Sequence, residues 1–149
     1  MSTAATRWMS GSLYSATETQ YMTKYTDAAL LTADRCQGMD KPDVKKVWAY
    51  TIQELNAYDE GCPRNAFIGL CEEGMVKGIP SGCYGLRKDN KNKGYAVAAA
   101  NLIMSGHEVD NNAIWQQVTS GYVQPHDQVN IVIALYDAGL LQHCSMAEK

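Results

Sequence analysis

The fold is decided by the stretch PHDQVNIVIALYDAG, residues 125–139 of the sequence. Pro125 and Asp127 are typical of a helix start and Gly139 of a helix end, so the stretch predicts one helix. Its apolar residues form two stripes at helical spacing, which together cover most of the helix surface: Val129, Val132, Ile133 and Tyr136, and Ile131, Ala134, Leu135 and Ala138. A helix that is apolar almost all round is covered by its neighbours, so we expect residues 131–135 at the centre of a bundle.

The same periodicity, followed outward from this stretch, predicts the helices that would surround it. They cover residues 17–36, 42–58, 63–74, 95–105 and 110–121. Asp40, Asn92 and Asp110 are the predicted N-caps, and Pro42 is predicted in the first turn of its helix.

Strand-like alternation is scarce in this sequence. Residues 74–79 and 121–123 are the candidates for a β pairing, and it would be very short. A chain of 149 residues has the size of one domain, and its 46% of apolar residues is enough to form a core. We therefore expect an all-α fold, a compact bundle of five to six helices, with room for one very short β pairing.

The chain is predicted to form a single helical domain over residues 1–149. Within it we expect a flexible arm over residues 1–12, an N-terminal helical pair over 13–60 and a C-terminal helical unit over 61–141. The longest apolar runs are far shorter than a membrane-spanning helix, and no secretory signal is present at the start. These features predict a cytoplasmic protein that does not enter a membrane.

The sequence lacks the motifs of common catalytic, metal and cofactor sites. It has neither a Walker loop, a G-x-G-x-x-G turn nor a G-x-S-x-G elbow. Its five cysteines, Cys36, Cys62, Cys71, Cys83 and Cys144, are too dispersed for a zinc site and are predicted to be reduced thiols. Glu72 and Glu73 point about 100° apart on a helix, so we expect a solvated face there. No catalytic residue, metal or cofactor is predicted.

An idiosyncratic stretch, GCPRNAFIGLCEEGMVKGIP, spans residues 61–80. Its motif Cys62-Pro63-Arg64-Asn65-Ala66-Phe67 … Gly74 … Lys77-Gly78-Ile79-Pro80 resembles a family of small bacterial and phage proteins classed as a domain of unknown function. The resemblance covers roughly residues 61–141 and implies the fold, but the family has no activity to carry over. Small proteins of this kind also occur on phages and plasmids, where some inhibit a host nuclease complex, as anti-CRISPR proteins do.

A basic segment follows the motif and is the predicted partner-binding site. Its candidate residues are Lys77, Tyr84, Arg87, Lys88, Lys91 and Lys93, with only Asp89 opposing their charge. Tyr and Arg often dominate the binding energy of protein interfaces, and the glycines between them allow a sharply turned loop. Two interpretations remain: a surface for an acidic partner, and a solvated connector without a partner.

We expect a non-enzymatic binding or inhibitory protein that acts through protein–protein contact, because catalytic motifs are absent and 9 Tyr and 3 Trp favour interfaces. The partner could be a bacterial defence or nuclease complex. The first alternative is a small cytoplasmic enzyme with a polar pocket formed by Arg64, Asn65, Glu72 and Lys77. The second is a binder of nucleic acid or phosphate through residues 77–93, against which the net charge of −3 argues. No oligomeric state follows from the sequence.

Overall fold

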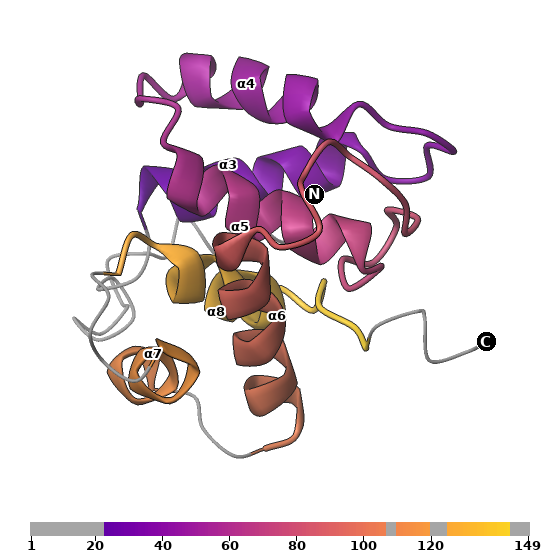
Figure 1. Ribbon diagram of the computed structural model, residues 1–149. Coiled ribbons are helices and arrows are strands. Elements are labelled where there is room, and N and C mark those ends of the chain that lie inside the picture. The colour runs from indigo at the N-terminus through magenta and orange to yellow at the C-terminus, as the bar shows by residue number, and fades with distance from the viewer. Residues whose placement is uncertain (1–22, 107–109, 120–124, 144–149) are drawn as a thin grey trace.

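The computed structural model describes residues 23–106, 110–119 and 125–143, and helices dominate these parts of the chain (Figure 1). In chain order the helices are α3 (Lys24–Arg35), α4 (Val44–Glu54), α5 (Gly61–Glu72), α6 (Lys91–Met104), α7 (Asn111–Thr119) and α8 (Gln128–Asp137). The predicted all-α bundle is confirmed. The predicted arm, residues 1–12, and the predicted start of the first helix, residues 17–22, lie outside the described residues.

Helix α8 lies at the centre of the bundle, where the sequence places it. It packs against α3, α5, α6 and α7. Ile131, Val132 and Leu135 are fully buried, and Ile133 is only 5% exposed. Because four helices cover most of its surface, both of its apolar stripes contribute to the hydrophobic core, although Tyr136 and Ala138 at their C-terminal end are exposed.

Helices α3 and α4 pack against each other and close one side of the bundle (Figure 1). Arg35 joins their ends by donating to the Thr51 hydroxyl at 2.9 Å and pairing with Glu54 at 2.7 Å. Trp48 of α4 is fully buried and stacks on Phe67 of α5, with ring centroids 5.5 Å apart. The aromatic pair therefore ties this layer to the next helix.

Two predicted caps were placed wrongly. Asp43, not Asp40, caps α4, because its carboxylate accepts the backbone N–H three residues on, and Pro42 is buried just before the helix begins. Asn90, not Asn92, caps α6 in the same way. In both cases the true cap is the residue whose oxygen reaches an unpaired N–H of the first helical turn. The predicted cap of α7, Asp110, accepts from Ala113 N at 3.0 Å and is confirmed.

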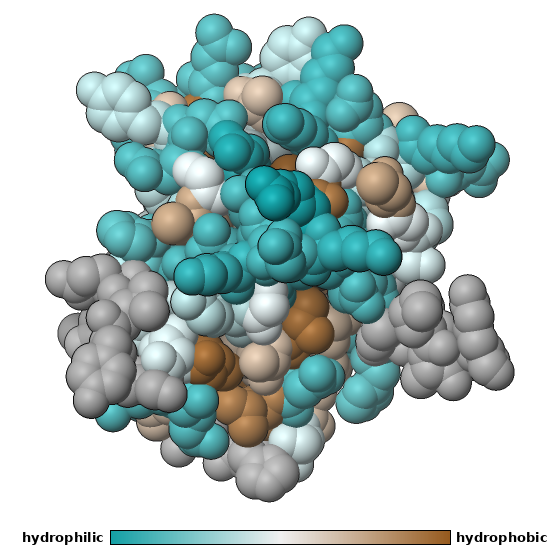
Figure 2. Space-filling view, in the orientation of Figure 1, coloured by the Kyte–Doolittle hydropathy of each residue, from teal (hydrophilic) through white to brown (hydrophobic). Residues whose placement is uncertain are grey.

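Helix α6 links α5 to the C-terminal helices. Its Tyr95 ring meets Trp115 of α7 edge to face at 5.2 Å, and Asn92 accepts from Gln128 of α8 at 3.0 Å. Figure 2 shows mostly hydrophilic residues over the side of α4 and α5 and a smaller hydrophobic area over the region of α6 and α7.

The β pairing is reduced to one bridge in the part of the chain that the structure describes. Val76 and Leu141 form an isolated antiparallel bridge. The predicted partner of this stretch, residues 121–123, lies outside the described residues. None of the described helices is both long and apolar enough to cross a membrane.

Candidate functional site

A long ordered segment without helix joins α5 to α6. Helix α5 ends at Glu72 and α6 begins at Lys91, so the connection covers residues 73–90, which we call the 73–90 loop. Its regular structure is limited to the bridge at Val76. Connections of this length inside a compact domain are uncommon and are usually functional when they are ordered. The 73–90 loop is therefore the candidate functional site.

The first half of the 73–90 loop closes on itself. The backbone N–H of Gly82 donates to the Glu72 carbonyl at 3.1 Å, which brings the two ends of this half together. Met75 and Ile79 are buried inside the closure, at 0% and 2% exposure. Compact loops whose ends meet and whose own side chains fill them are frequently functional surfaces.

Helix α3 and the turn after it hold the tip of this closed half. The Gln37 side-chain amide donates to the carbonyls of Lys77, at 2.7 Å, and Ala33, at 3.0 Å, and Gly38 N donates to the Gly78 carbonyl at 3.1 Å. A side chain at Gly78 would place its Cβ 1.9 Å from the Gln37 Oε1 atom, and the φ of Gly78 is +87°. The positive φ therefore favours glycine there, and a side chain would also displace the Gln37 amide from its contacts.

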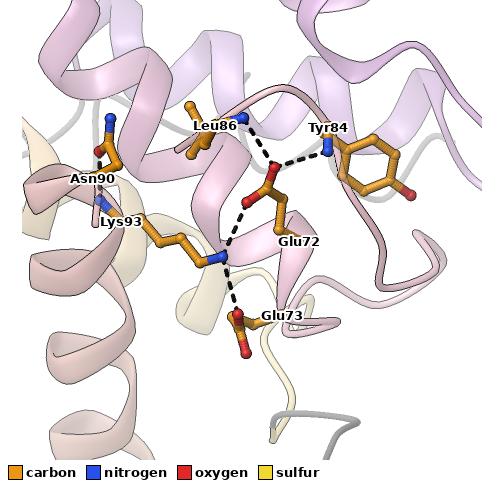
Figure 3. A network of polar contacts seen from close by, with 6 residues as sticks. All are labelled: Glu72, Glu73, Tyr84, Leu86, Asn90 and Lys93. Atoms are coloured by element: carbon orange, nitrogen blue, oxygen red, sulfur yellow. Dashed lines mark hydrogen bonds and ion pairs between the residues drawn. The ribbon is translucent and has the colours of Figure 1, made fainter. Parts of the chain in front are cut away.

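One carboxylate, that of Glu72, organises the second half of the loop (Figure 3). Its Oε2 atom accepts from Tyr84 N at 2.8 Å and from Leu86 N at 3.1 Å. Its Oε1 atom accepts from the Lys93 ammonium at 2.9 Å, and the Glu72 side chain is only 5% exposed. A charged hydrogen-bond acceptor shared by two backbone amides and an ammonium fixes the loop against the ends of two helices.

Lys93 completes the cluster. Its ammonium also pairs with Glu73 at 3.0 Å (Figure 3). Burial lowers the pKa of Lys93, but the hydrogen bonds to Glu72 and Glu73 outweigh that effect and leave the pKa raised. The Lys93 stem lies against Gly69, where an added Cβ would come within 2.6 Å of the Lys93 Cβ atom. Gly69 therefore lets α5 and α6 approach closely enough for the ion pair to form.

The expectation of a solvated face at Glu72 and Glu73 was wrong for Glu72, which is buried. The partners of Glu72 lie 12 to 21 residues away in sequence, so no local pattern names them. A signal does exist: two carboxylates at the C-terminal end of a helix oppose the helix dipole, which favours cations there. Such a local conflict indicates a cation from elsewhere, and Lys93 provides it.

The structure separates the predicted partner-binding residues into two groups. Lys77, Arg87, Lys88 and Lys91 are exposed, on the loop or at its exit into α6. The pairing of Arg87 with Asp89 at 3.6 Å leaves their side chains 86% and 81% exposed, so it contributes little to stability.

Tyr84 and Lys93 instead face the protein. The Tyr84 hydroxyl donates to the Pro80 carbonyl and its backbone N–H to Glu72. Burial, followed by the nearby Cys71, Cys36 and Glu72, raises the pKa of Tyr84. These two residues therefore hold the loop in shape, whereas the four exposed cations are available for contact with a partner.

The residues of the alternative polar pocket lie at two ends of one helix. Arg64, in the first turn of α5, donates to the Asn65 side chain and pairs with Asp59, both at 3.3 Å. Glu72 lies eight residues further on, about 12 Å along the axis at 1.5 Å per residue. Lys77 is exposed on the loop. The structure thus brings Arg64 and Asn65 together and gives Glu72 a separate set of contacts.

In the part of the chain that the structure describes, the cysteines are not arranged to bind a metal ion. Cys36 and Cys71 are buried free thiols, Cys62 is half-buried and Cys83 is exposed; Cys144 lies outside the described residues. Burial is the main cause that raises the pKa of Cys71 well above its ordinary value, which keeps the thiol neutral and unreactive. Among the described residues, no group of three or more His, Cys, Asp or Glu side chains is arranged to hold a metal ion.

Comparison with known proteins gives one match. Residues 22–142 match the sequence pattern of a protein family whose description reads "Family of unknown function (DUF6979)". No curated protein and no protein of solved structure matches the chain. The match covers all six described helices and the whole 73–90 loop.

Proposed function

The chain belongs to this family of unknown function, and we propose that it is a cytoplasmic, non-enzymatic binding protein that acts through protein–protein contact. Its contact surface is the outer rim of the 73–90 loop, which we define by the exposed cations Lys77, Arg87, Lys88 and Lys91. The partner is a protein with an acidic face.

The observation that carries this proposal is the combination of an ordered backbone with exposed charge. Glu72 fixes the backbone at Tyr84 and Leu86, and Gln37 fixes it at Lys77. The cations on the rim form none of these contacts through their side chains. A loop that is already ordered loses little conformational entropy when a partner binds, so more of the contact energy is available for affinity.

A protein partner fits the charge of the molecule better than a nucleic acid. The chain has a net charge of −3, and Asp89 stands between the cations of the rim. Nucleic-acid binding depends on the neutralisation of many phosphates by a broad basic face. Three cations on the loop and Lys91 at the start of α6 match an acidic patch on a protein and would direct its orientation and association rate.

Inhibition is the form of contact that we propose for this surface. The target would be a bacterial defence complex, and the inhibitor would be phage- or plasmid-borne, acting like an anti-CRISPR protein. Such an inhibitor covers a functional surface of its target and needs no catalytic group. A small domain with one rigid charged loop has the properties that this role requires.

The test is a triple charge reversal, Arg87→Glu, Lys88→Glu and Lys91→Glu, in the full chain. A tagged wild-type protein is used to capture partners from a bacterial extract, and affinity is then measured by calorimetry with the purified partner at several salt concentrations. We expect the reversal to weaken binding at least about tenfold and the wild-type affinity to fall as salt rises.

The matched control reverses three other exposed lysines, Lys41, Lys45 and Lys46, and changes the net charge by the same amount. It should bind like the wild type, and both variants should keep the wild-type melting temperature. If the triple reversal in the loop binds as tightly as the wild type at low salt, the rim is not the contact surface. If the captured material is instead a nucleic acid, shown by its loss on nuclease treatment, the partner is a nucleic acid and not a protein.

A further inference from the structure

The turn between α4 and α5, residues 55–60, lies at the opposite end of α5 from the 73–90 loop (Figure 1). It presents the aromatic ring of Tyr58 to solvent. Tyr58 is 84% exposed, whereas the other exposed large apolar residues in the described parts of the chain, such as Tyr50 at 57%, are less so. A ring in this position contributes almost nothing to the hydrophobic core.

The backbone on the N-terminal side of Tyr58 is held by α3. The Tyr25 hydroxyl donates to the Tyr58 carbonyl at 2.8 Å, and the Lys24 ammonium donates to the Asn56 carbonyl at 3.1 Å. Asn56 itself adopts a left-handed conformation, with φ 61°, that turns the chain out of α4. The exposed ring is therefore attached to a fixed backbone.

The chain after Tyr58 is fixed as well. The Asp59 carboxylate accepts from the Trp48 ring N–H at 3.1 Å and pairs with Arg64 at 3.3 Å. Glu60 N donates to the Tyr58 carbonyl at 3.0 Å. The contacts of the turn also engage two cations of the neighbouring helices, because Arg64 of α5 pairs with Asp59 and Lys24 of α3 donates to the Asn56 carbonyl.

Glu60 adds an exposed carboxylate two residues from the ring. It is the N-cap residue of α5, but its side chain makes no capping hydrogen bond. Ser, Thr, Asp or Asn would normally cap a helix at this position, and glutamate is a poor substitute. Burial first, and then Glu60, Asp127 and Asp59, raise the pKa of Tyr25 beneath the turn, in agreement with a negative potential there.

We propose that Tyr58 and Glu60 form a second protein-contact surface, which takes an arginine or lysine side chain of a partner protein against the Tyr58 ring. A cation is attracted to the face of an aromatic ring, and a nearby carboxylate strengthens this attraction. Because the backbone of the turn is already fixed, only the Tyr58 side chain has to be ordered on binding. This surface is separate from the 73–90 loop, and the proposal does not depend on the function proposed for that loop.

The probe is a short capped peptide with two arginines between glycines. The control is the same peptide with glutamates in place of the arginines. Each is titrated at millimolar concentration into the isotopically labelled full chain, and backbone amide shifts are followed by nuclear magnetic resonance. We expect the arginine peptide to shift the amides of residues 56–60, and the glutamate peptide to leave them unchanged.

Variants separate the ring from its neighbours. Tyr58→Phe should retain binding, whereas Tyr58→Leu should weaken it about twofold to fivefold, the range of one exposed cation–ring contact. Glu60→Gln removes an exposed charge pairing and should weaken binding up to about fivefold. Tyr50→Leu is the matched control, because Tyr50 is also an exposed aromatic residue but lies on α4 itself, and this variant should bind like the wild type.

Four outcomes would overturn the proposal. The arginine peptide could leave residues 56–60 unshifted, or it could shift all exposed acidic residues alike, as an unspecific cation does. Tyr58→Leu could also bind as well as Tyr58→Phe, so that the ring has no part in binding. A shift of the same amides on dilution of the protein alone would show that a second copy, and not a basic partner, occupies the surface.

Discussion

Helix α8 and the 73–90 loop are both well packed, but different forces hold them in place. Most side chains of α8 are buried by other helices, and its residues from Ile131 to Leu135 are at most 5% exposed. The second half of the 73–90 loop is held mainly by hydrogen bonds, and the Glu72 carboxylate accepts two from its backbone and one from Lys93 of α6. Burial of apolar area is non-directional, whereas hydrogen bonds to a single acceptor depend on its position.

This difference predicts how the two regions respond to substitution. Apolar burial in α8 is shared by many side chains, so damage to the centre of the helix affects the whole bundle. The second half of the loop depends on one charged group, so its removal should free this half while the helices remain folded. Local opening of this kind is common in proteins, because different segments have different stabilities.

The largest effect is expected for Ile133→Asp in α8. An unpaired carboxylate in the core costs several kcal/mol, about half the stability of a typical domain, so the variant should be unfolded or close to it. Tyr136→Asp is the control on the same helix, because Tyr136 is 44% exposed, and it should cost about 1 kcal/mol. Circular dichroism melts compare the two. An Ile133→Asp protein with the wild-type melting temperature would show that α8 is not the centre of the fold.

A smaller and more local effect is expected for Glu72→Ala. The substitution removes the acceptor of Tyr84 N and Leu86 N and one partner of Lys93, at a cost of about 3 kcal/mol. Hydrogen exchange at these two amides should become much faster, while exchange in α8 follows only the change in global stability.

Glu73→Ala is the matched control, since Glu73 pairs with the same ammonium but is 30% exposed, whereas the Glu72 side chain is only 5% exposed. It should cost less than about 1 kcal/mol and leave loop exchange unchanged. If Glu72→Ala and Glu73→Ala loosen the loop equally, Glu72 does not organise it.

The smallest effect concerns alkaline pH. The pKa of Lys93 is raised above its ordinary 10.5, so its ion pairs contribute fully below that pH and are lost as the pH rises through the raised value. Lys93→Arg stays charged in this range, because the pKa of arginine is above about 12. We expect the free energy of unfolding to fall less steeply above pH 10.5 in Lys93→Arg than in the wild type.

Urea unfolding at a series of pH values measures this difference. Ionisation of buried groups such as Cys71, whose pKa is raised by burial, lowers stability equally in both proteins and cancels in the comparison. Parallel curves for the two proteins would show that the Lys93 ion pairs do not contribute to stability in this pH range.

Much of the fold could be predicted from the sequence, but the loop could not. The helices follow from the 3.6-residue period of apolar residues, and the burial of α8 follows from its lack of a polar face. The caps at Asp43 and Asn90 were missed by two or three residues, because several nearby Asp and Asn residues suit a cap equally well and only the backbone path selects one. The exposed cations of the loop were predicted as a group, but the inward position of Tyr84 and Lys93 was not.

The sequence by itself determined the class of the fold, the central helix and the stretch that marks the family. Each depends only on the spacing or identity of residues that are close in the sequence, so it can be recognised from the sequence alone. Tertiary structure alone decided that Glu72 is buried, that Lys93 neutralises it and that Tyr58 stands exposed on a fixed turn. The physical reason is that each of these depends on partners from other elements, such as Lys93 on α6 and Tyr25 on α3. Such partners meet only when the helices pack.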